Sequence, residues 1–226
     1  MRLPSRIIAL LMIAATPVAG GEKAPTLLAD GFDFPVGKPD GDGYYKARGY
    51  RPNGHLGEDW NGKRGGDSDL GDPVYACGNG AVVFAENFGR GWGNVVIIRH
   101  VYEEGGTQKY VDSLYGHLGA IMVRYGIHVR RGQQIGTIGT GGGLYDAHLH
   151  FEIRKDLRVG MARHRFPHDD RTYWSPTDFI AARRTLTASA KSAMIPIFTF
   201  VPYKETTPVA APDKRKPGLS VPGPGG

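Results

Sequence analysis

Two histidines stand two residues apart in the stretch AHLHFEI, residues 147–153. Polar and apolar residues alternate through its second half, and this period of two predicts a half-buried β-strand. The apolar side chains would enter a core, while His148, His150 and Glu152 would share the opposite face. Two imidazoles held side by side can bind one metal ion, or one can bind while the other transfers protons.

Two earlier segments supply further candidates, HLGEDW at residues 55–60 and LYGHLG at residues 114–119. A hydrolytic zinc site uses three imidazole or carboxylate ligands and keeps a fourth position for water. His55, Asp59 and one histidine of the later pair would complete such a set. Bound zinc lowers the pKa of its water to about 7 and polarises a substrate carbonyl. His117 and the remaining histidine of the pair are then free for proton transfer or oxyanion stabilisation.

The order H-x-x-x-D, then G-H-L, then H-x-H, on a glycine-rich β chain, resembles the lysostaphin-type (LytM-like) zinc metalloendopeptidases, which cut peptidoglycan cross-bridges. Strand-like segments follow in the same order, so the resemblance covers roughly residues 32–153, with a weaker similarity at SPTDFI. Three loops look longer than a minimal member needs, residues 61–72, 102–112 and 154–174. Because loops build binding clefts, the substrate preference stays open.

The resemblance implies one Zn²⁺ ion bound by His55, Asp59 and His150. It also implies that His117 and His148 are the non-ligand catalytic pair. Which of the two is the base and which stabilises the oxyanion stays open, and we favour His148 as the base. Spacing alone does not decide which histidine of the H-x-H pair binds metal. Glu152 either orients a metal-bound imidazole through its second ring nitrogen or forms an ordinary salt bridge with an arginine.

The expected fold is mainly β. The resemblance implies an antiparallel β-sheet or barrel-like core of the lysostaphin-type (duplicated hybrid motif) fold with a short C-terminal helix. The 34 glycines and 16 prolines suit many short strands joined by tight turns. Strands are predicted within residues 73–87, 93–101, 109–118 and 130–139, with a hairpin corner at 129–136. A helix is predicted in SPTDFIAARR, capped by Ser175.

Three segments are expected along the chain. Residues 1–20 have a basic start, a short apolar run and small residues before a cleavage site, which predicts a signal peptide. Residues 21–203 form the predicted zinc endopeptidase domain, with its core at about 32–182. Residues 204–226 are rich in Pro and Gly, and disorder is expected there.

Export follows from the predicted signal peptide, with the periplasm as the first choice and secretion as the alternative. The apolar run is shorter than the roughly 20 residues that span a bilayer, so no stable membrane insertion is expected after cleavage. Removing residues 1–20 takes away two arginines and lowers the formal charge from +6 to +4. This balance suits an anionic envelope polymer such as peptidoglycan, whereas no pattern typical of nucleic-acid binding occurs.

Other reactive side chains are interpreted more simply. Cys77 is the only cysteine, so no intramolecular disulfide can form, and we expect a small buried hydrophobe. His100 and His128 are predicted to be solvated at strand edges, and His164 and His168 to lie on a loop surface. Glu58 lacks the H-E-x-x-H context of a metalloprotease base. For Trp60 and Tyr115, core packing is the default interpretation.

The leading hypothesis is therefore an exported zinc metalloendopeptidase that hydrolyses peptide bonds in peptidoglycan stem peptides or cross-links. The alternative is a non-catalytic peptidoglycan-binding regulator of the same fold that activates an amidase. Such a regulator would be expected to lose metal residues, whereas all five motif positions are kept here. A lipoyl-like carrier domain, suggested by VRRGQQIG, lacks the lysine that a carrier must modify at the turn.

Overall fold

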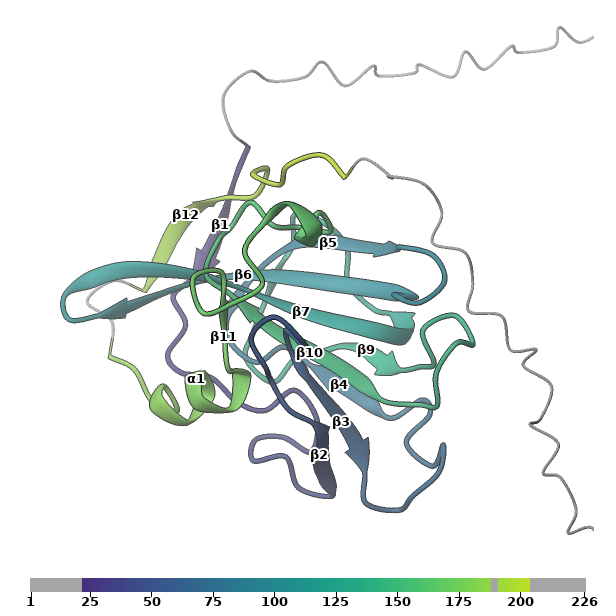
Figure 1. Cartoon of the computed structure of the whole chain (residues 1–226). Helices are drawn as coiled ribbons and strands as arrows, with labels where there is room; N and C mark the ends of the chain where they lie inside the picture. Colours follow the sequence, from purple (N-terminus) through teal and green to yellow (C-terminus); the bar gives the residue numbers. More distant parts are fainter. Residues whose placement is uncertain (1–21, 188–190, 204–226) are drawn as a thin grey trace, which may run out of the picture.

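The computed structural model describes residues 22–187 and 191–203 of the 226-residue chain, and their fold is mainly β (Figure 1). The predicted signal peptide and C-terminal tail lie outside the described residues. No helix in the described ranges is long and apolar enough to cross a membrane.

Twelve strands, one 3-10 helix and one short α-helix make up the regular structure of the described residues. In chain order they are β1 (Lys23–Leu27), β2 (Tyr44–Arg48), β3 (Glu58–Gly62), β4 (Pro73–Tyr75), β5 (Gly80–Asn87), β6 (Asn94–Glu104), β7 (Thr107–Ile121), β8 (His128–Val129), β9 (Gln134–Ile138), β10 (Leu149–Arg154), η1 (Arg163–Arg165), β11 (Tyr173–Trp174), α1 (Pro176–Ala182) and β12 (Ser192–Pro196).

Ten of the strands form one antiparallel sheet with the order β2-β3-β10-β7-β6-β5-β8. β11 adds to β10, and β9 joins β7 to β4. β1 and β12 pair with each other, so the start and the end of the described chain meet (Figure 1). The prediction of a mainly β, antiparallel fold with a short C-terminal helix is therefore confirmed.

Apolar side chains cover both faces of the central strands. Along β6, Val96 and Ile98 belong to one buried cluster, while Val95 and Ile97 belong to the other. Alternate residues of a strand point to opposite faces, so each cluster packs against one face of the sheet. This two-sided burial fixes the register of the strands that carry the candidate site, because a slip by one residue would exchange the two faces.

β10 is buried on both faces, so the prediction of a half-buried strand is wrong. Leu149, Phe151 and Ile153 enter the core as expected, but His150 and Glu152 are also buried. β10 lies in the middle of the sheet, between β3 and β7, where neighbours exclude water. A polar face in such a place must find its hydrogen bonds inside the protein.

The segment at residues 129–136 is a tight turn, but it is not the predicted hairpin corner. β8 pairs with β5, whereas β9 pairs with β4 and β7, so the two arms of the turn join different parts of the sheet. Gly132 at the turn has φ +71°, a conformation that glycine adopts easily. Local turn signals predict such a reversal but not the partners of its arms.

Helix α1 starts where the sequence predicts, with Ser175 at the N-cap position and Pro176 first in the helix. The Ser175 side chain makes no capping hydrogen bond, contrary to expectation. Instead, the Thr177 backbone N–H donates to a carboxylate oxygen of Glu58 at 3.2 Å. A carboxylate from β3 thus takes the place of the local cap.

Candidate metal centre

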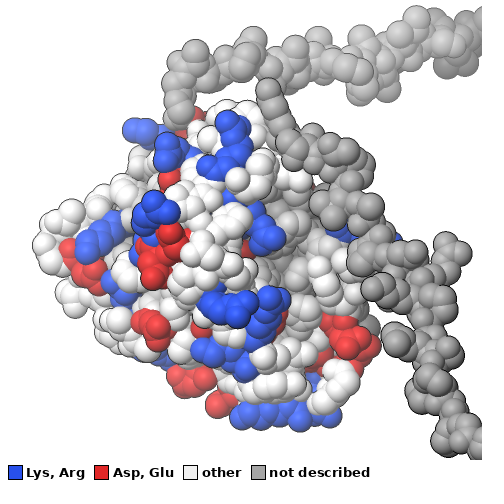
Figure 2. Space-filling view, viewed as in Figure 1, with Lys and Arg blue, Asp and Glu red and all other residues white. Residues whose placement is uncertain are grey.

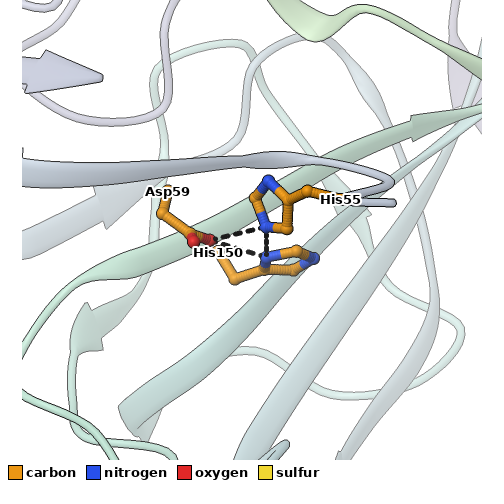
Figure 3. A group of neighbouring side chains, drawn as sticks. All are labelled: His55, Asp59 and His150. Atoms are coloured by element: carbon orange, nitrogen blue, oxygen red, sulfur yellow. Dashed lines mark hydrogen bonds and ion pairs between the residues drawn. The ribbon is translucent and has the colours of Figure 1, made fainter. Parts of the chain in front are cut away.

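Three side chains converge on one point: Asp59 on β3, His150 on the neighbouring β10, and His55 on the loop that leads into β3 (Figure 3). His150 on β10 is paired in register with Asp59 on β3, and His55 lies four residues before Asp59. The separations are 2.8 Å from His150 Nδ1 to Asp59 Oδ1, 3.1 Å from His55 Nε2 to Asp59 Oδ1, and 3.2 Å between the two imidazole nitrogens. Residues far apart in the sequence are therefore brought to metal-ligand spacing.

The spacing of the three atoms fits a small tetrahedral ion. Ligand atoms about 2.0–2.2 Å from a tetrahedral zinc ion lie about 3.3–3.6 Å from each other. The three separations observed here are 2.8, 3.1 and 3.2 Å, somewhat shorter than that edge length, so a small outward shift of the side chains would admit the ion. Two imidazoles and one carboxylate are also a donor set that zinc commonly uses.

The second nitrogen of each imidazole is held by an acceptor. His55 Nδ1 lies 3.1 Å from the Gly49 carbonyl, and His150 Nε2 lies 2.9 Å from Glu152 Oε1. Donation of these N–H groups leaves His55 Nε2 and His150 Nδ1 with lone pairs that face Asp59. In that tautomer the three facing atoms are all electron-rich and repel each other, so the arrangement suits a cation. Without a cation, a proton on His150 Nδ1 or His55 Nε2 bonds to Asp59 instead.

Electrostatics keeps both carboxylates of the site ionised. Burial acts to raise the pKa of Asp59, but in the metal-free arrangement hydrogen bonds from protonated ring nitrogens of His150 and His55 outweigh it, and the pKa falls below its ordinary value. Burial also opposes ionisation of Glu152, yet the Arg154 charge and the His150 hydrogen bond bring its pKa to about 2. Glu152 contacts both groups, with Arg154 Nε 2.6 Å from Oε2. The two contacts weighed for Glu152 from the sequence thus exist together.

His148 lies at the rim of this centre, just before β10. Its Nδ1 lies 2.8 Å from the Asp146 carbonyl, and its Nε2 lies 3.9 Å from Asp59 Oδ1. Donation from Nδ1 leaves the Nε2 lone pair directed toward the centre. The side chain is partly exposed, so solvent or a bound molecule can reach it.

His117 reaches the site through an irregularity in β7. Asn94 is opposite Leu118 but Val96 is opposite Tyr115, so β7 has one residue more than β6 between these pairs. Such a bulge re-aims a side chain, and His117 has φ +61° there. Its ring lies 4.8 Å from that of His148. The alternation of the sequence gives no sign of this extra residue.

The His117 ring is buried. Its Nδ1 is out of contact with solvent and has no hydrogen-bond partner within the described part of the chain. Burial, with smaller electrostatic contributions from His150 and His148, lowers the pKa of His117 to about 3. His117 is therefore neutral at physiological pH in this arrangement.

Two aromatic residues that sequence reasoning missed border the histidines. The Trp92 ring lies 5.6 Å from His150 and 6.2 Å from His117. The Tyr145 ring lies 4.9 Å from His117 and 5.8 Å from His148, and Tyr145 is 45% exposed. Both residues follow glycine-rich turns, and no regular spacing in the sequence links them to the histidines or predicts the contacts. Their contacts depend on how the loops fold onto the sheet.

The remaining histidines lie away from the centre, and the prediction for two of them was wrong. His100 is fully buried, with Nδ1 2.8 Å from the Asn79 carbonyl and Nε2 2.7 Å from Ser113 Oγ. His128 is partly buried against Thr26, with 3.0 Å between Nδ1 and Oγ1. The central position of β6 in the sheet, which strand pairing decides, explains the burial of His100. His164 is exposed, as expected.

The structural interpretations of the other candidates are confirmed. Trp60, Tyr115 and Cys77 belong to the same core cluster. Glu58 is 1% exposed and bonds to Lys46 and Thr177, so it is tied to the scaffold instead of facing the centre.

The observed fold and centre define a mainly β protein with a possible metal site, and comparisons with known proteins place it in a family. The model of Peptidase family M23 matches residues 54–162. The chain is 40% identical over 84 residues to the lipoprotein NlpD of Yersinia enterocolitica, a match that covers 37% of this chain and 78% of that protein. The chain therefore belongs to peptidase family M23.

Other relatives differ in the roles that their names give. Over 84 residues, or 37% of this chain, it is 40% identical to the peptidoglycan DD-endopeptidase ShyA of Vibrio cholerae and 39% identical to the murein hydrolase activator NlpD of Escherichia coli. The chain covers only 18% and 20% of the lengths of these two proteins. Among solved structures, lysostaphin from Staphylococcus simulans is 27% identical, with 62% of this chain and 50% of that chain covered and a TM-score of 0.46.

Proposed function

We propose that the protein is an exported zinc metalloendopeptidase that hydrolyses peptide bonds in peptidoglycan stem peptides or cross-links. The observation that supports it is the convergence of His55 Nε2, Asp59 Oδ1 and His150 Nδ1 at separations of 2.8–3.2 Å. The proposal includes a signal peptide at residues 1–20 and a catalytic domain at residues 21–203.

His55, Asp59 and His150 would hold the zinc ion, and Glu152 would fix the His150 ring through its 2.9 Å contact. When bound, zinc lowers the pKa of a water molecule and polarises a peptide carbonyl. The buried Glu152–Arg154 pair keeps the supporting carboxylate ionised, so it accepts the imidazole N–H at all pH values near neutrality. Such outer contacts raise the basicity of a ligand and fix its tautomer.

His148 is the proposed general base. Its Nδ1 donates to the Asp146 carbonyl, so the free Nε2 can take a proton from the attacking water and pass it to the leaving amine. His117 is the proposed partner that stabilises the charge on the carbonyl oxygen. The 4.8 Å separation of the two rings lets both contact one reacting centre.

A second candidate is a regulator that activates an amidase, and the relatives named murein hydrolase activators favour it. A regulator needs a binding surface but no metal centre or base. The presence of all five motif residues, His55, Asp59, His117, His148 and His150, is the reason to place the enzyme first.

The decisive experiment is a digest of purified, cross-linked peptidoglycan by the chain from residue 21, with fragments identified by mass spectrometry. It compares added zinc with chelator, and wild type with His148→Ala and with His164→Ala, an exposed histidine of η1 that is not among the converging side chains. Zinc content is measured for each variant. We expect dimers to become monomers with zinc-loaded wild type and His164→Ala only, while His148→Ala still binds zinc.

The fragment masses would identify the bond that is cut. If the zinc-loaded wild type leaves every cross-link intact, the endopeptidase proposal is wrong. Stimulation of a purified amidase by the same preparation would then support the regulator.

A further inference from the structure

The long loop after β10, residues 155–172, contains several cations whose partners differ. Arg158 lies 2.6 Å from Asp156, and Arg171 lies 2.8 Å from Asp169. Arg163, in η1 of the same loop, forms no ion pair with any described residue. Figure 2 shows basic and acidic side chains interspersed over much of one face of the molecule. An exposed arginine is therefore common on this surface, and the position of Arg163 is what gives it interest.

Arg163 is held beside the metal centre. Its guanidinium carbon lies 5.3 Å from the centre of the Trp92 ring, and that ring lies 5.6 Å from the His150 ring. Stacking on an aromatic face fixes the direction of the guanidinium. Because Arg163 is exposed, its donors stay available to another molecule. A solvated surface arginine would be ordinary, but this one is two contacts away from a candidate metal ligand.

The same loop extends the positive region away from the centre. Arg165, also in η1, lines an open pocket of about 450 Å³ together with Arg158, Arg171 and the carboxylate of Asp156, so Arg165 is the cation there without an acidic partner among the described residues. Arg165 makes only one long hydrogen bond, 3.4 Å to the Pro202 carbonyl, and no ion pair with a described residue. Arg163 and Arg165 lie two residues apart in η1, between Arg158 and Arg171 in the sequence.

We propose that Arg163 binds a carboxylate of the peptide substrate, and that Arg165 and its pocket favour further negative charge along the same peptide; this rests on the proposed function. The two contacts that join Arg163 to His150 measure 5.3 and 5.6 Å, so the two side chains lie at most about 11 Å apart. An extended peptide advances about 3.5 Å per residue, so the carboxylate would lie within about three residues of the cleaved bond. The planar guanidinium matches a carboxylate with two parallel hydrogen bonds. The substrate class is thus an acidic stem peptide with free carboxylates.

Binding tests this without cleavage. A synthetic, uncross-linked acidic stem peptide and the same peptide with its carboxylates converted to carboxamides are titrated by calorimetry into the zinc-loaded chain. Wild type is expected to bind the acid at least about tenfold more tightly, as for charged hydrogen bonds. Arg163→Ala should lose this preference, and Arg163→Lys should keep part of it. Arg124→Ala, at an exposed arginine on the loop after β7 that forms no ion pair with residues 22–187 or 191–203, is the matched control and should leave it unchanged.

Equal affinity for the two peptides, or a preference that survives Arg163→Ala, would overturn the proposal. Zinc content and unfolding temperature, measured for each variant, show whether it is folded. The comparison of the acid peptide with the carboxamide peptide on the wild type tests the proposal even if a variant fails to fold. Tighter binding of a glycerol-phosphate polymer than of the acid peptide would also overturn it. Cleavage of peptidoglycan without a carboxylate preference refutes this inference alone, whereas a preference without cleavage refutes only the endopeptidase proposal.

Discussion

At the residue scale, the histidines near Asp59 differ in which ring nitrogen is free. Backbone carbonyls accept from Nδ1 of His55 and of His148, whereas the buried Glu152 carboxylate faces Nε2 of His150. The two members of the H-x-H pair therefore present different nitrogens to the centre. Spacing in the sequence places both on one strand but does not distinguish them. The distinction comes from two acceptors: the Asp146 carbonyl, two residues before His148, and the Glu152 carboxylate, two residues after His150.

The buried His100 predicts a pH-dependent stability. Burial lowers its pKa to about 4, whereas an unfolded histidine titrates near 6.5. Between these values the unfolded state binds one proton more than the folded state. The free energy of unfolding should therefore fall as the pH falls from about 6.5 to 4, by about 3 kcal/mol from this residue. Urea unfolding at pH 7 and pH 4.5, with chelator present, measures the change.

The contribution of His100 is obtained by difference. His100→Gln is expected to be less stable than wild type at pH 7, since a buried network is altered, but to lose less stability on acidification. The exposed His164→Gln should show the full wild-type dependence. An equal pH slope for His100→Gln and wild type would mean that His100 does not titrate as its burial requires.

At the element scale, strand positions were predictable and strand partners were not. Alternation and β-branched runs identify β5, β6 and β7, because these patterns are local. The bulge that turns His117 toward His148 and the separate partners of β8 and β9 depend on contacts distant in sequence. The family resemblance nevertheless named the three residues that converge in the structure, because the order of the motifs stands in for the missing geometry. It said nothing about Trp92 or Arg163, which belong to loops.

The approach of the His55 loop to β10 depends on Gly57. A Cβ at this position would lie 2.5 Å from the Phe151 carbonyl oxygen and 2.8 Å from Glu152 Cγ. Gly57→Ala should therefore push the loop from the strand and separate His55 from His150. We expect a loss of about 1–3 kcal/mol of stability and markedly weaker zinc binding, measured by thermal unfolding and by competition with a zinc chelator.

Gly49→Ala in the same connection is the control, because the nearest atoms to its added Cβ are those of Lys46 at 4.0 Å. This variant keeps the backbone carbonyl that accepts from His55. It should bind zinc as wild type does. Wild-type zinc affinity in Gly57→Ala would show that the close packing of loop and strand is unnecessary for the centre.

At the scale of the whole molecule, a buried arginine in the central sheet joins segments that are distant in the chain. Arg99 in β6 is fully buried and bonds to both carboxylate oxygens of Asp112 in β7, at 2.7 Å each. It also donates to the carbonyls of Leu157, after β10, and of Pro196, in β12. One guanidinium thus ties the last strand and the arginine-bearing loop to the core.

This arrangement makes Asp112 a sensitive position. Asp112→Asn leaves the Arg99 charge buried without a counter-ion, and removing one partner of a buried pair typically costs about 3–5 kcal/mol. The matched change Asp156→Asn removes a carboxylate from the exposed Arg158, where water replaces the partner, so little change is expected. Urea unfolding of both variants tests the contrast, and similar losses would contradict it. The double variant Arg99→Met/Asp112→Asn should recover part of the loss, because the unpaired charge is gone, but not all of it, because the Leu157 and Pro196 carbonyls lose their donor.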